Sequence, residues 1–556
     1  MNLFSKIFIG LMGTGLLLSS CDNVLDVDYD NVLLEKDYQM DSPNDTIYSM
    51  MGILSELESL GERYVVLGEL RGDLLEITEN ASTSLKDIYN FSVQADNPYA
   101  NVRDYYGVIN RCNFLIHNID TAIVSRGQKV MYKEFAAAKA IRAWTYLQLA
   151  LNHGLVKYYE QPLTSIQDAE KDMEELGPDA LLPRLIADLE PVRDIPLPGE
   201  LPLGDDVDDS RQLLFPVQFV LGDLYLYNQE YEKAAQAYYD LMWSQGYLST
   251  SIYQSEWSVT NGEFTSYYLY WTSIFNVGVS RSEHISLIGG SSEFGTPYRL
   301  DSLFFLNREI APTQVAVENW AAQVYFHNST VVKEGDLRGE NGSYYSAEMT
   351  AMYYNMFFGS DAPENTDLIA VRKHRNMYTD EFWGVQIYRI GLLYLRYAEA
   401  VNRAGKPNLA FAVLKNGLTA NTLANDEIVP LHEKTPALAP WMDFTGPRFN
   451  IYATSNNIDV IGIHGRGNGS IHLSEDFRIP SLPTLQDSIL YVEDKIVEEL
   501  ALETAFEGNR FHDLMRVAKR RNNPGYLAAK VAEKHDNRAA IEALLMQESN
   551  WYLPIK

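Results

Sequence analysis

FPVQFVLGDLYLYNQEYEKAAQAYYDLM, residues 215–242, carries the strongest indication of architecture in this 556-residue chain. Within it Gly222, Tyr225, Ala234 and Tyr238 follow one another at intervals of 3, 9 and 4 residues. Small residues let two antiparallel helices approach closely, and the larger side chains fill the groove between them. The spacing therefore predicts a closely packed helix pair.

The same intervals recur in residues 394–418, YLRYAEAVNRAGKPNLAFAVLKNGL, at Ala398, Val401, Ala410 and Leu414. Small and large residues at these offsets are typical of tetratricopeptide helix pairs. Two further segments have strongly helical sequences and can each supply a pair or half of one: residues 132–154 and 488–521. The chain is therefore predicted to be mainly α, with a tetratricopeptide-like scaffold of helix pairs.

Long insertions separate these helical segments along the chain. Residues 246–385 place aromatics, Ser, Thr, Asn and Gly between short apolar runs, which is typical of loops and a few short strands. Residues 420–488 have a similar composition, with Pro and Gly throughout. The expected divisions are a cleaved signal segment, an N-terminal helical region, a loop-rich insertion that offers a ligand surface, and a C-terminal helical region: residues 1–20, 21–245, 246–385 and 386–556.

The start of the chain is expected to be a lipoprotein signal. Lys6 precedes an apolar run at residues 7–18, and small Ser19 and Ser20 stand directly before Cys21. The apolar run is too short to span a bilayer as a helix. The order Leu-Ser-Ser-Cys resembles the bacterial lipobox, in which the cysteine is acylated and becomes the new N-terminus. Cys21 is therefore predicted to be the membrane anchor, and a plain signal peptide with a chance cysteine is the alternative.

The charge of the chain bears on its partners. It has 75 acidic and 45 basic residues, a formal net charge of -30, which argues against binding nucleic acid or an anionic lipid surface. Cys112 is the only other cysteine, so a disulfide framework is not expected. It lies in an apolar periodic segment and is predicted to be a small buried hydrophobic residue rather than a nucleophile.

Signals for metals and catalysis are weak. The acidic stretch GDDVDDS, residues 204–210, is interpreted as a solvated linker, and a structural calcium site there is the only cofactor considered, although the full calcium-loop spacing is missing. Glu499, Glu503 and Glu507 stand four apart on one predicted helical face. They fit either the acid–base pair of a glycosidase or ion pairs that tie a helix pair together around Gly508, and the second is favoured. No recognised catalytic motif supports an enzyme.

Several segments together resemble the SusD/RagB-like family of outer-membrane lipoproteins of the Bacteroidetes type. Behind the lipobox come, in the family's order, YYGVINRCNFLIHNI (105–119), GDLR (335–338), YRIGLLYLRYAEAVNRAG (388–405), EELALETAFEGNRFHDLMR (498–516) and NWYLPIK (550–556). The resemblance covers essentially the whole mature chain. GIHGRGNG, residues 462–469, is more similar to the RagB-like branch than to the starch-binding one.

The resemblance implies a function. A protein of this family sits at the cell surface, is not catalytic, and acts as a lid on a SusC-like TonB-dependent transporter that takes up glycans or oligopeptides. The RagB-like segment and the negative charge favour peptides, whereas the 36 tyrosines fit either ligand. The alternative is a surface-anchored glycoside hydrolase or peptidase that uses carboxylates on the insertions.

Ligand contacts are expected in the early loops and the central insertion, because ligands in this family tend to meet these parts. The candidate residues are Asp73, Asn97, Tyr99, Tyr270 and Trp271. Aromatic rings stack on sugar faces or peptide side chains, while a carboxylate and an amide fix orientation through hydrogen bonds. Burial of these aromatics in the core is the competing interpretation.

Overall fold

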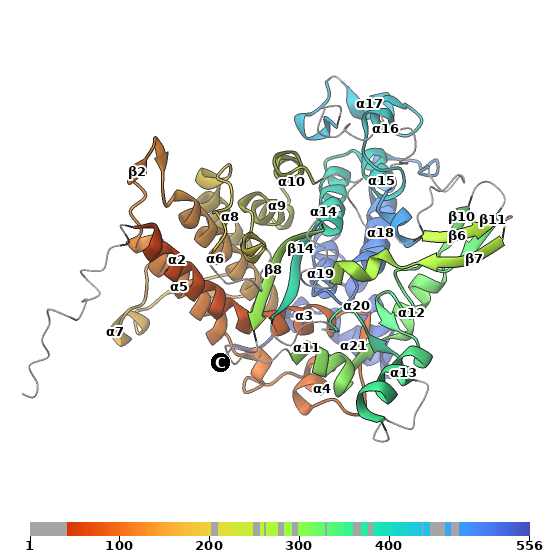
Figure 1. The fold of residues 1–556 in the computed structure, drawn as a ribbon, viewed down its shortest axis with the longest axis horizontal. Coiled ribbons are helices and arrows are strands. Elements are labelled where there is room, and N and C mark those ends of the chain that lie inside the picture. Colours follow the sequence, from red (N-terminus) through yellow and green to blue (C-terminus); the bar gives the residue numbers. More distant parts are fainter. Residues whose placement is uncertain are drawn as a thin grey trace, which may run out of the picture.

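Figure 1 shows the computed structural model of the chain as a ribbon. The structure describes residues 40, 42–201, 209–247, 256–260, 263–275, 283–291, 299–327, 331–359, 368–375, 382–435, 437–444, 462–468 and 478–555. Helices dominate these residues, as the sequence predicts, and the mainly α fold class is confirmed.

Both predicted helix pairs are present. The first consists of α9 (Val217–Tyr227) and α10 (Tyr231–Gln245), which pack against each other. A Cβ atom on Gly222 would overlap the ring of Tyr238, so the glycine is what allows the two helices to approach this closely. The second pair consists of α14 (Ile390–Arg403) and α15 (Pro407–Lys415).

The pairs are separated along the chain but adjacent in space. Helix α6 (Tyr132–His153) packs on α8 (Pro178–Leu189) and α9, and α10 packs on α14. Helix α14 in turn contacts α15 and α18 (Leu485–Glu503), and α18 is followed by α19 (Arg510–Arg520). The insertions are therefore looped out of a continuous row of helices, which crosses the view of Figure 1.

The remaining helices lie around this row. On the N-terminal side they are α2 (Pro43–Leu57), α3 (Gly61–Glu69), α4 (Thr83–Tyr89), α5 (Arg103–Asn118) and α7 (Ile166–Ala169). The central insertion contributes α11 (Arg299–Asp301), α12 (Gln314–Ala321) and α13 (Ala347–Phe358). The C-terminal part adds α16 (Ala420–Ala424), α17 (Leu431–Lys434), α20 (Pro524–Ala532) and α21 (Arg538–Leu545).

Strands are short, and among the described residues each pairs with only one other, always antiparallel. The pairs are β1 (Leu75–Ile77) with β9 (Ile310–Pro312), β2 (Val124–Ser125) with β3 (Gln128–Lys129), β4 (Val156–Tyr158) with β5 (Glu174–Leu176), β6 (Glu256–Thr260) with β7 (Glu263–Tyr268), β8 (His284–Ser291) with β14 (Phe382–Arg389), β10 (Val324–His327) with β11 (Val331–Glu334), and β12 (Tyr344–Tyr345) with β13 (Ala370–Val371). The β8–β14 ribbon pairs an inner segment of the central insertion with its C-terminal end and leads directly into α14.

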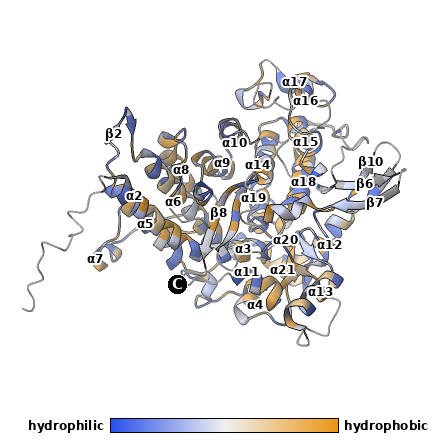
Figure 2. Ribbon diagram, viewed as in Figure 1, coloured by the Kyte–Doolittle hydropathy of each residue, from blue (hydrophilic) through white to orange (hydrophobic). Residues whose placement is uncertain are grey.

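A single large hydrophobic cluster runs through the helices from α2 to α21. Figure 2 shows the pattern behind it, since most helices carry both hydrophobic and hydrophilic residues. Cys112 is fully buried in this cluster, as predicted, and burial raises the pKa of its thiol to about 12. In the described part of the chain, no helix has both the length and the apolar character needed to cross a bilayer.

Candidate functional site

The family-like segment at residues 498–516 forms the corner between α18 and α19. Gly508 has a φ of +100°, in the left-handed region that favours glycine, so the chain turns sharply there. Gly68 of α3 lies against this corner, and a Cβ atom on it would overlap the carbonyl oxygen of Gly508. The two glycines therefore allow the N-terminal and C-terminal parts of the scaffold to touch through their backbones.

Glu69 completes this corner from α3. Its carboxylate accepts hydrogen bonds from the backbone N–H groups of Phe506, Gly508, Asn509 and Arg510 at 2.8–3.3 Å. Burial raises the pKa of Glu69 to about 7, and the four N–H groups act in the opposite direction. The carboxylate thus binds backbone donors that would otherwise be unsatisfied at the start of α19.

The glutamates of α18 are buried and paired with arginines. Glu503 accepts from Arg338 at 2.8 Å, and from Arg389 and Arg466 at 2.6 Å each. All four side chains are almost inaccessible to solvent. Arg466 belongs to the GIHGRGNG segment, whose described residues form a short helical turn at Ile463–Gly467.

The same network holds the other two glutamates. Glu499 lies 2.7 Å from Arg338 and 2.8 Å from the ring of His464. Glu507 accepts from Lys373 at 2.6 Å and from Arg389 at 2.7 Å. The predicted ion pairs are therefore present, but their cations come from the two insertions and β14 rather than from α19, so they do not join the two helices of the pair to each other. Because every carboxylate of this set is buried against cations, none is placed to act as acid or base on a glycan.

Sequence-predicted residues of the early loops have partners within the protein. Asp73 is only 3% exposed, and its two carboxylate oxygens accept from Arg510 at 2.6 and 2.7 Å. Asn97 caps a short helical turn by accepting from the N–H of Tyr99, whose hydroxyl donates to Glu62 at 2.6 Å. These contacts assign structural work to Asp73, Asn97 and Tyr99, and their ligand-binding role stays a prediction.

The two central candidates differ in exposure although they are neighbours in sequence. Trp271 is fully buried, donates from its ring N–H to Ser343 at 3.2 Å, and has the cations of Lys373, Arg389 and Arg466 within 5.0–5.3 Å of its ring centre. Its ring therefore belongs to the ion-pair network. Tyr270 is 46% exposed and stacks on Tyr268, with ring centres 6.1 Å apart. Tyr270 is thus the only candidate of the five with an exposed aromatic face.

Two predictions fall wholly or largely outside the described residues. Cys21, the expected lipid anchor, lies in the undescribed start of the chain. Of the acidic stretch 204–210, only Asp209 and Ser210 are described, and Asp209 pairs with Arg211 rather than with a metal ligand set. In the described ranges no group of three or more His, Cys, Asp or Glu side chains is arranged to hold a metal ion.

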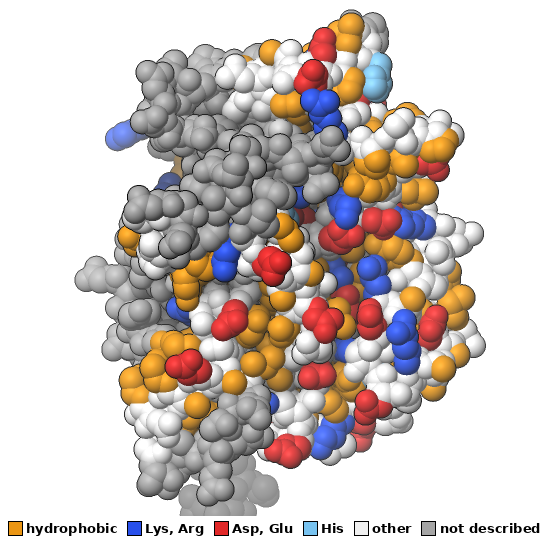
Figure 3. All heavy atoms as spheres, turned by 90° about the vertical axis from the view of Figure 1, so that its right-hand side faces the viewer, with side chains coloured by type: hydrophobic (Ala, Val, Ile, Leu, Met, Phe, Trp, Pro, Cys, Tyr) orange, Lys and Arg blue, Asp and Glu red, His pale blue; other side chains and the backbone are white. Residues whose placement is uncertain are grey.

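Figure 3 shows the side of the molecule that lies at the right of Figure 1. Acidic and basic side chains are interspersed on this face, and the described residues drawn there form no continuous basic field. The net charge of -30 is thus not displayed on this side as a field of one sign. Local charge, rather than the total, sets what this face can attract.

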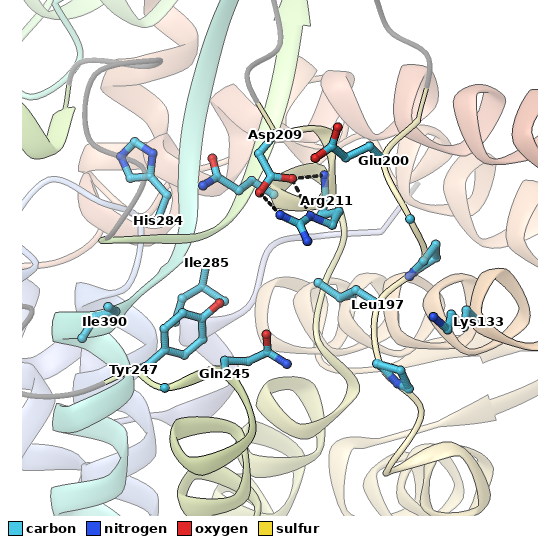
Figure 4. Close-up of a pocket in the computed structure, with 15 residues that line it drawn as sticks. Lys133, Leu197, Glu200, Asp209, Arg211, Gln245, Tyr247, His284, Ile285 and Ile390 are labelled. Carbon is cyan, nitrogen blue, oxygen red and sulfur yellow. Dashed lines mark hydrogen bonds and ion pairs between the residues drawn. The ribbon is translucent and has the colours of Figure 1, made fainter. Parts of the chain in front are cut away.

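A cavity of about 710 Å³ lies between the N-terminal helices and the β8–β14 ribbon. Figure 4 shows the Asp209–Arg211 pair on one side of it and Tyr247 and Gln245 on the other. The lining comes from the start of α6, the segment after α8, the segment before α9, the end of α10, β8 and α14: Lys133, residues 196–200, Asp209, Arg211, Gln212, residues 245–247, His284, Ile285 and Ile390.

Most of the polar side chains that line this cavity are either uncharged at neutral pH or paired with a side chain of opposite charge. Arg211 forms a bidentate salt bridge with Asp209, in which two guanidinium N–H groups donate to the two carboxylate oxygens at 2.8 and 2.7 Å. Burial raises the pKa of Tyr247 to about 12 and lowers that of His284, so both side chains are uncharged at neutral pH. Leu197 and other aliphatic side chains supply apolar surface. This mixture of amides, a phenol and apolar groups suits a neutral ligand rich in hydroxyl groups.

Sequence reasoning did not single out this cavity. Asp209, Arg211 and Gln212 lie at the end of, or just after, the acidic stretch interpreted as a linker, and Gln245 and Tyr247 lie where the predicted N-terminal region meets the central insertion. The available signal was Arg211, a cation placed directly after the acidic run that ends at Asp209. Gln245 ends α10 and Tyr247 follows it, with no sequence pattern that marks either residue, so only the fold brings them opposite Arg211.

Comparison with solved structures places this architecture. A SusD superfamily protein from Bacteroides thetaiotaomicron is 16% identical and aligns over 93% of this chain and 96% of its own, with a TM-score of 0.57. The chain has the SusD-like fold. The recognition made from the sequence segments is therefore confirmed at the level of the fold.

Two further solved structures with the SusD-like fold carry names that describe a ligand. Surface glycan-binding protein A from Bacteroides uniformis is 15% identical, with a TM-score of 0.56 over 92% of this chain and 96% of that one. Surface glycan-binding protein A from Bacteroides fluxus is 16% identical, with a TM-score of 0.55 over 90% and 92% of the two chains. The sequence itself matches no family model and no curated protein.

Proposed function

We propose that this protein is a non-catalytic surface lipoprotein that binds glycans and delivers them, as a lid, to a SusC-like TonB-dependent transporter in the outer membrane. One observation carries the proposal: the SusD-like fold is shared with surface glycan-binding proteins over at least 90% of either chain. At 15–16% identity the fold alone is common to these proteins, so the ligand and the partner belong to the proposal.

The cavity of Figure 4 is the glycan site in this proposal. Its volume of about 710 Å³ admits a short oligosaccharide segment, and its walls combine hydrogen-bonding groups with apolar surface. The ring of Tyr247 supplies a face for stacking, while Gln245 and Gln212 offer amides to sugar hydroxyls. The exposed Tyr268–Tyr270 pair is a second aromatic surface on the central insertion.

Calorimetric titration of the chain lacking residues 1–21 tests the function. A panel of neutral glycans and a mixed oligopeptide digest are titrated in parallel, and each mixture is assayed for cleavage. We expect saturable binding to a glycan without product. Binding to peptides alone would overturn the glycan proposal, cleavage would overturn the non-catalytic one, and no binding at all would show that the free protein is not a receptor.

Variants locate the site. Tyr247→Ala should weaken glycan binding about fivefold to tenfold, since an aromatic contact of this kind contributes about 1 kcal/mol. Tyr48→Ala, which removes a tyrosine that is 73% exposed on α2, is the matched control and should bind normally. If Tyr270→Ala loses affinity and Tyr247→Ala does not, the aromatic pair is the site and the cavity is not.

The delivery step has its own test. Co-expression with the SusC-like transporter should allow the two proteins to be purified together in detergent. If the full-length lipoprotein does not co-purify with any TonB-dependent barrel, the proposed role as a transporter lid is wrong, whereas the proposed glycan binding is unaffected.

A further inference from the structure

A second cavity, of about 560 Å³, lies among α12, α15, α18 and α20. Its described lining shares no residue with that of the cavity in Figure 4. The lining residues are Asn319, Ala322, Gln323, Phe411, Leu414, Lys415, His464, Tyr491, Lys495, Glu498, Glu499, Leu502 and Lys530.

Three lysines from three different helices line this second cavity. They are Lys415 at the end of α15, Lys495 in α18 and Lys530 in α20. In a chain with 75 acidic and only 45 basic residues, such a convergence of ammonium groups reverses the overall charge locally. A cavity focuses this local field on whatever enters it.

The two glutamates in the lining are already engaged. Glu498 lies 2.7 Å from Lys495, and Glu499 lies 2.7 Å from Arg338 and 2.8 Å from His464. Burial alone would raise the pKa of Glu499, but its cationic neighbours lower it instead, so this carboxylate stays ionised and committed to them. The lining therefore holds three lysines and two glutamates, and both glutamates are already bound to cations.

The remaining walls fit a sugar ring. Phe411, Leu414 and Leu502 supply apolar surface, and Tyr491 supplies a ring with a polar edge. Asn319 of α12 and Gln323, just after α12, contribute amides, and one N–H of the Gln323 side chain donates to the backbone carbonyl of Asn319 at 2.7 Å. A sugar has apolar C–H faces and hydroxyl edges, so a site of this composition differs from a plain anion site.

We propose that this second cavity binds the carboxylate of an acidic sugar, a uronate residue within an oligosaccharide. The carboxylate meets the lysines, the ring face meets Tyr491, and the hydroxyls meet the amides of Asn319 and Gln323. The inference rests on the proposed glycan-binding function and names a substrate class for it. Charge-assisted contacts to an ammonium group are stronger than neutral hydrogen bonds, so the carboxylate dominates recognition.

The test compares one glycan with and without its charge. The mature chain is titrated at low salt with an oligogalacturonate and with its fully methyl-esterified form, and neutral glycans are run in parallel. We expect the acid to bind at least tenfold more tightly than the ester and to lose affinity as salt is raised. Equal binding of acid and ester would overturn recognition of charge.

Lysine variants locate the effect. Lys415→Met with Lys530→Met should lose at least tenfold in affinity for the oligogalacturonate and leave neutral glycan binding unchanged. Lys86→Met with Lys171→Met, two exposed lysines away from the cavity, removes the same charge and should bind the acid normally. Circular dichroism and urea unfolding confirm that both double variants fold. If both lose affinity equally, net charge rather than the cavity is responsible and the inference is overturned.

Two further arms separate the causes of a failure. If inorganic phosphate displaces the oligogalacturonate at equal concentration, the cavity recognises a small anion and not a uronate. If neutral glycans bind and the oligogalacturonate does not, this inference fails while the proposed function stands. If no glycan of any charge binds, the proposed function fails and the inference fails with it.

Discussion

Glu503 illustrates how single residues stabilise this scaffold. Removing a carboxylate from water costs several kcal/mol, and the attraction of Arg338, Arg389 and Arg466 offsets that cost only because all three reach it at 2.6–2.8 Å. Burial alone would raise the pKa of Glu503, but the three arginines lower it to about 2. The residue therefore stays ionised in the folded state under ordinary conditions.

Glu503→Gln should lower the free energy of unfolding by about 3–5 kcal/mol near pH 7, because three buried cations lose their shared partner. The folded-state pKa lies below that of the unfolded chain, so this contribution is complete above about pH 4.5. It should shrink by about 1.4 kcal/mol per pH unit as the pH falls from there towards 2. Urea unfolding of both proteins between pH 7 and 3.5 measures the difference.

Glu498→Gln is the matched control, because Glu498 stands on the same helix but is largely exposed and paired only with Lys495. It should change stability by less than about 1 kcal/mol at every pH. A Glu503→Gln deficit that does not depend on pH would mean that the carboxylate charge is not what stabilises the network.

At the level of elements, one glycine sets the spacing of the α9–α10 pair. A Cβ atom on Gly222 would overlap the ring of Tyr238, whose hydroxyl is fixed by a 2.6 Å hydrogen bond to Asp223. The ring cannot move aside without breaking that bond. Close approach of the two helices therefore depends on the absence of a side chain at one position.

Gly222→Ala should destabilise the protein by about 1–3 kcal/mol, the usual cost of adding a methyl group to a filled core. Gly199→Ala serves as control, since a Cβ atom there would meet nothing within 4 Å, and it should be neutral or slightly stabilising. Thermal unfolding followed by circular dichroism ranks the three proteins. Equal melting temperatures would show that the interface between α9 and α10 can accommodate a methyl group at position 222.

The helix pairs were predictable because their signal is local. Gly222 and Tyr238 lie within one short stretch, so their spacing reports the contact directly. The contacts and the burial of the candidate ligand residues were not predictable in this way. Asp73 pairs with Arg510, 437 positions away, and no local pattern announces that contact. The alternation of aromatic residues in SYYLYWTSIF, residues 266–275, indicates that some of them are buried. Only the fold shows that Trp271 is buried and Tyr270 exposed.

For the molecule as a whole, the expected anchor defines where the protein works. Cys21→Ala should abolish incorporation of a radiolabelled fatty acid, because it removes the thiol that is acylated, and should move the protein to the soluble fraction once the apolar segment of residues 1–20 has been cleaved. Cys112→Ala is the control and should remain membrane-bound, since that thiol is buried in the core. Membrane retention of Cys21→Ala would identify another anchor.

The hydrogen bonds between Glu69 and the backbone at the start of α19 have a consequence for how the protein folds during synthesis. The first of its backbone partners lies 437 residues further along the chain, so the N-terminal helices remain without this clasp until nearly the entire polypeptide is available. When contacts between the two ends of a chain are needed to complete the fold, the chain cannot become fully compact while it is still being synthesised. In the proposed surface lipoprotein, that delay keeps the polypeptide unfolded, and therefore able to pass through a secretion channel, until synthesis is almost complete.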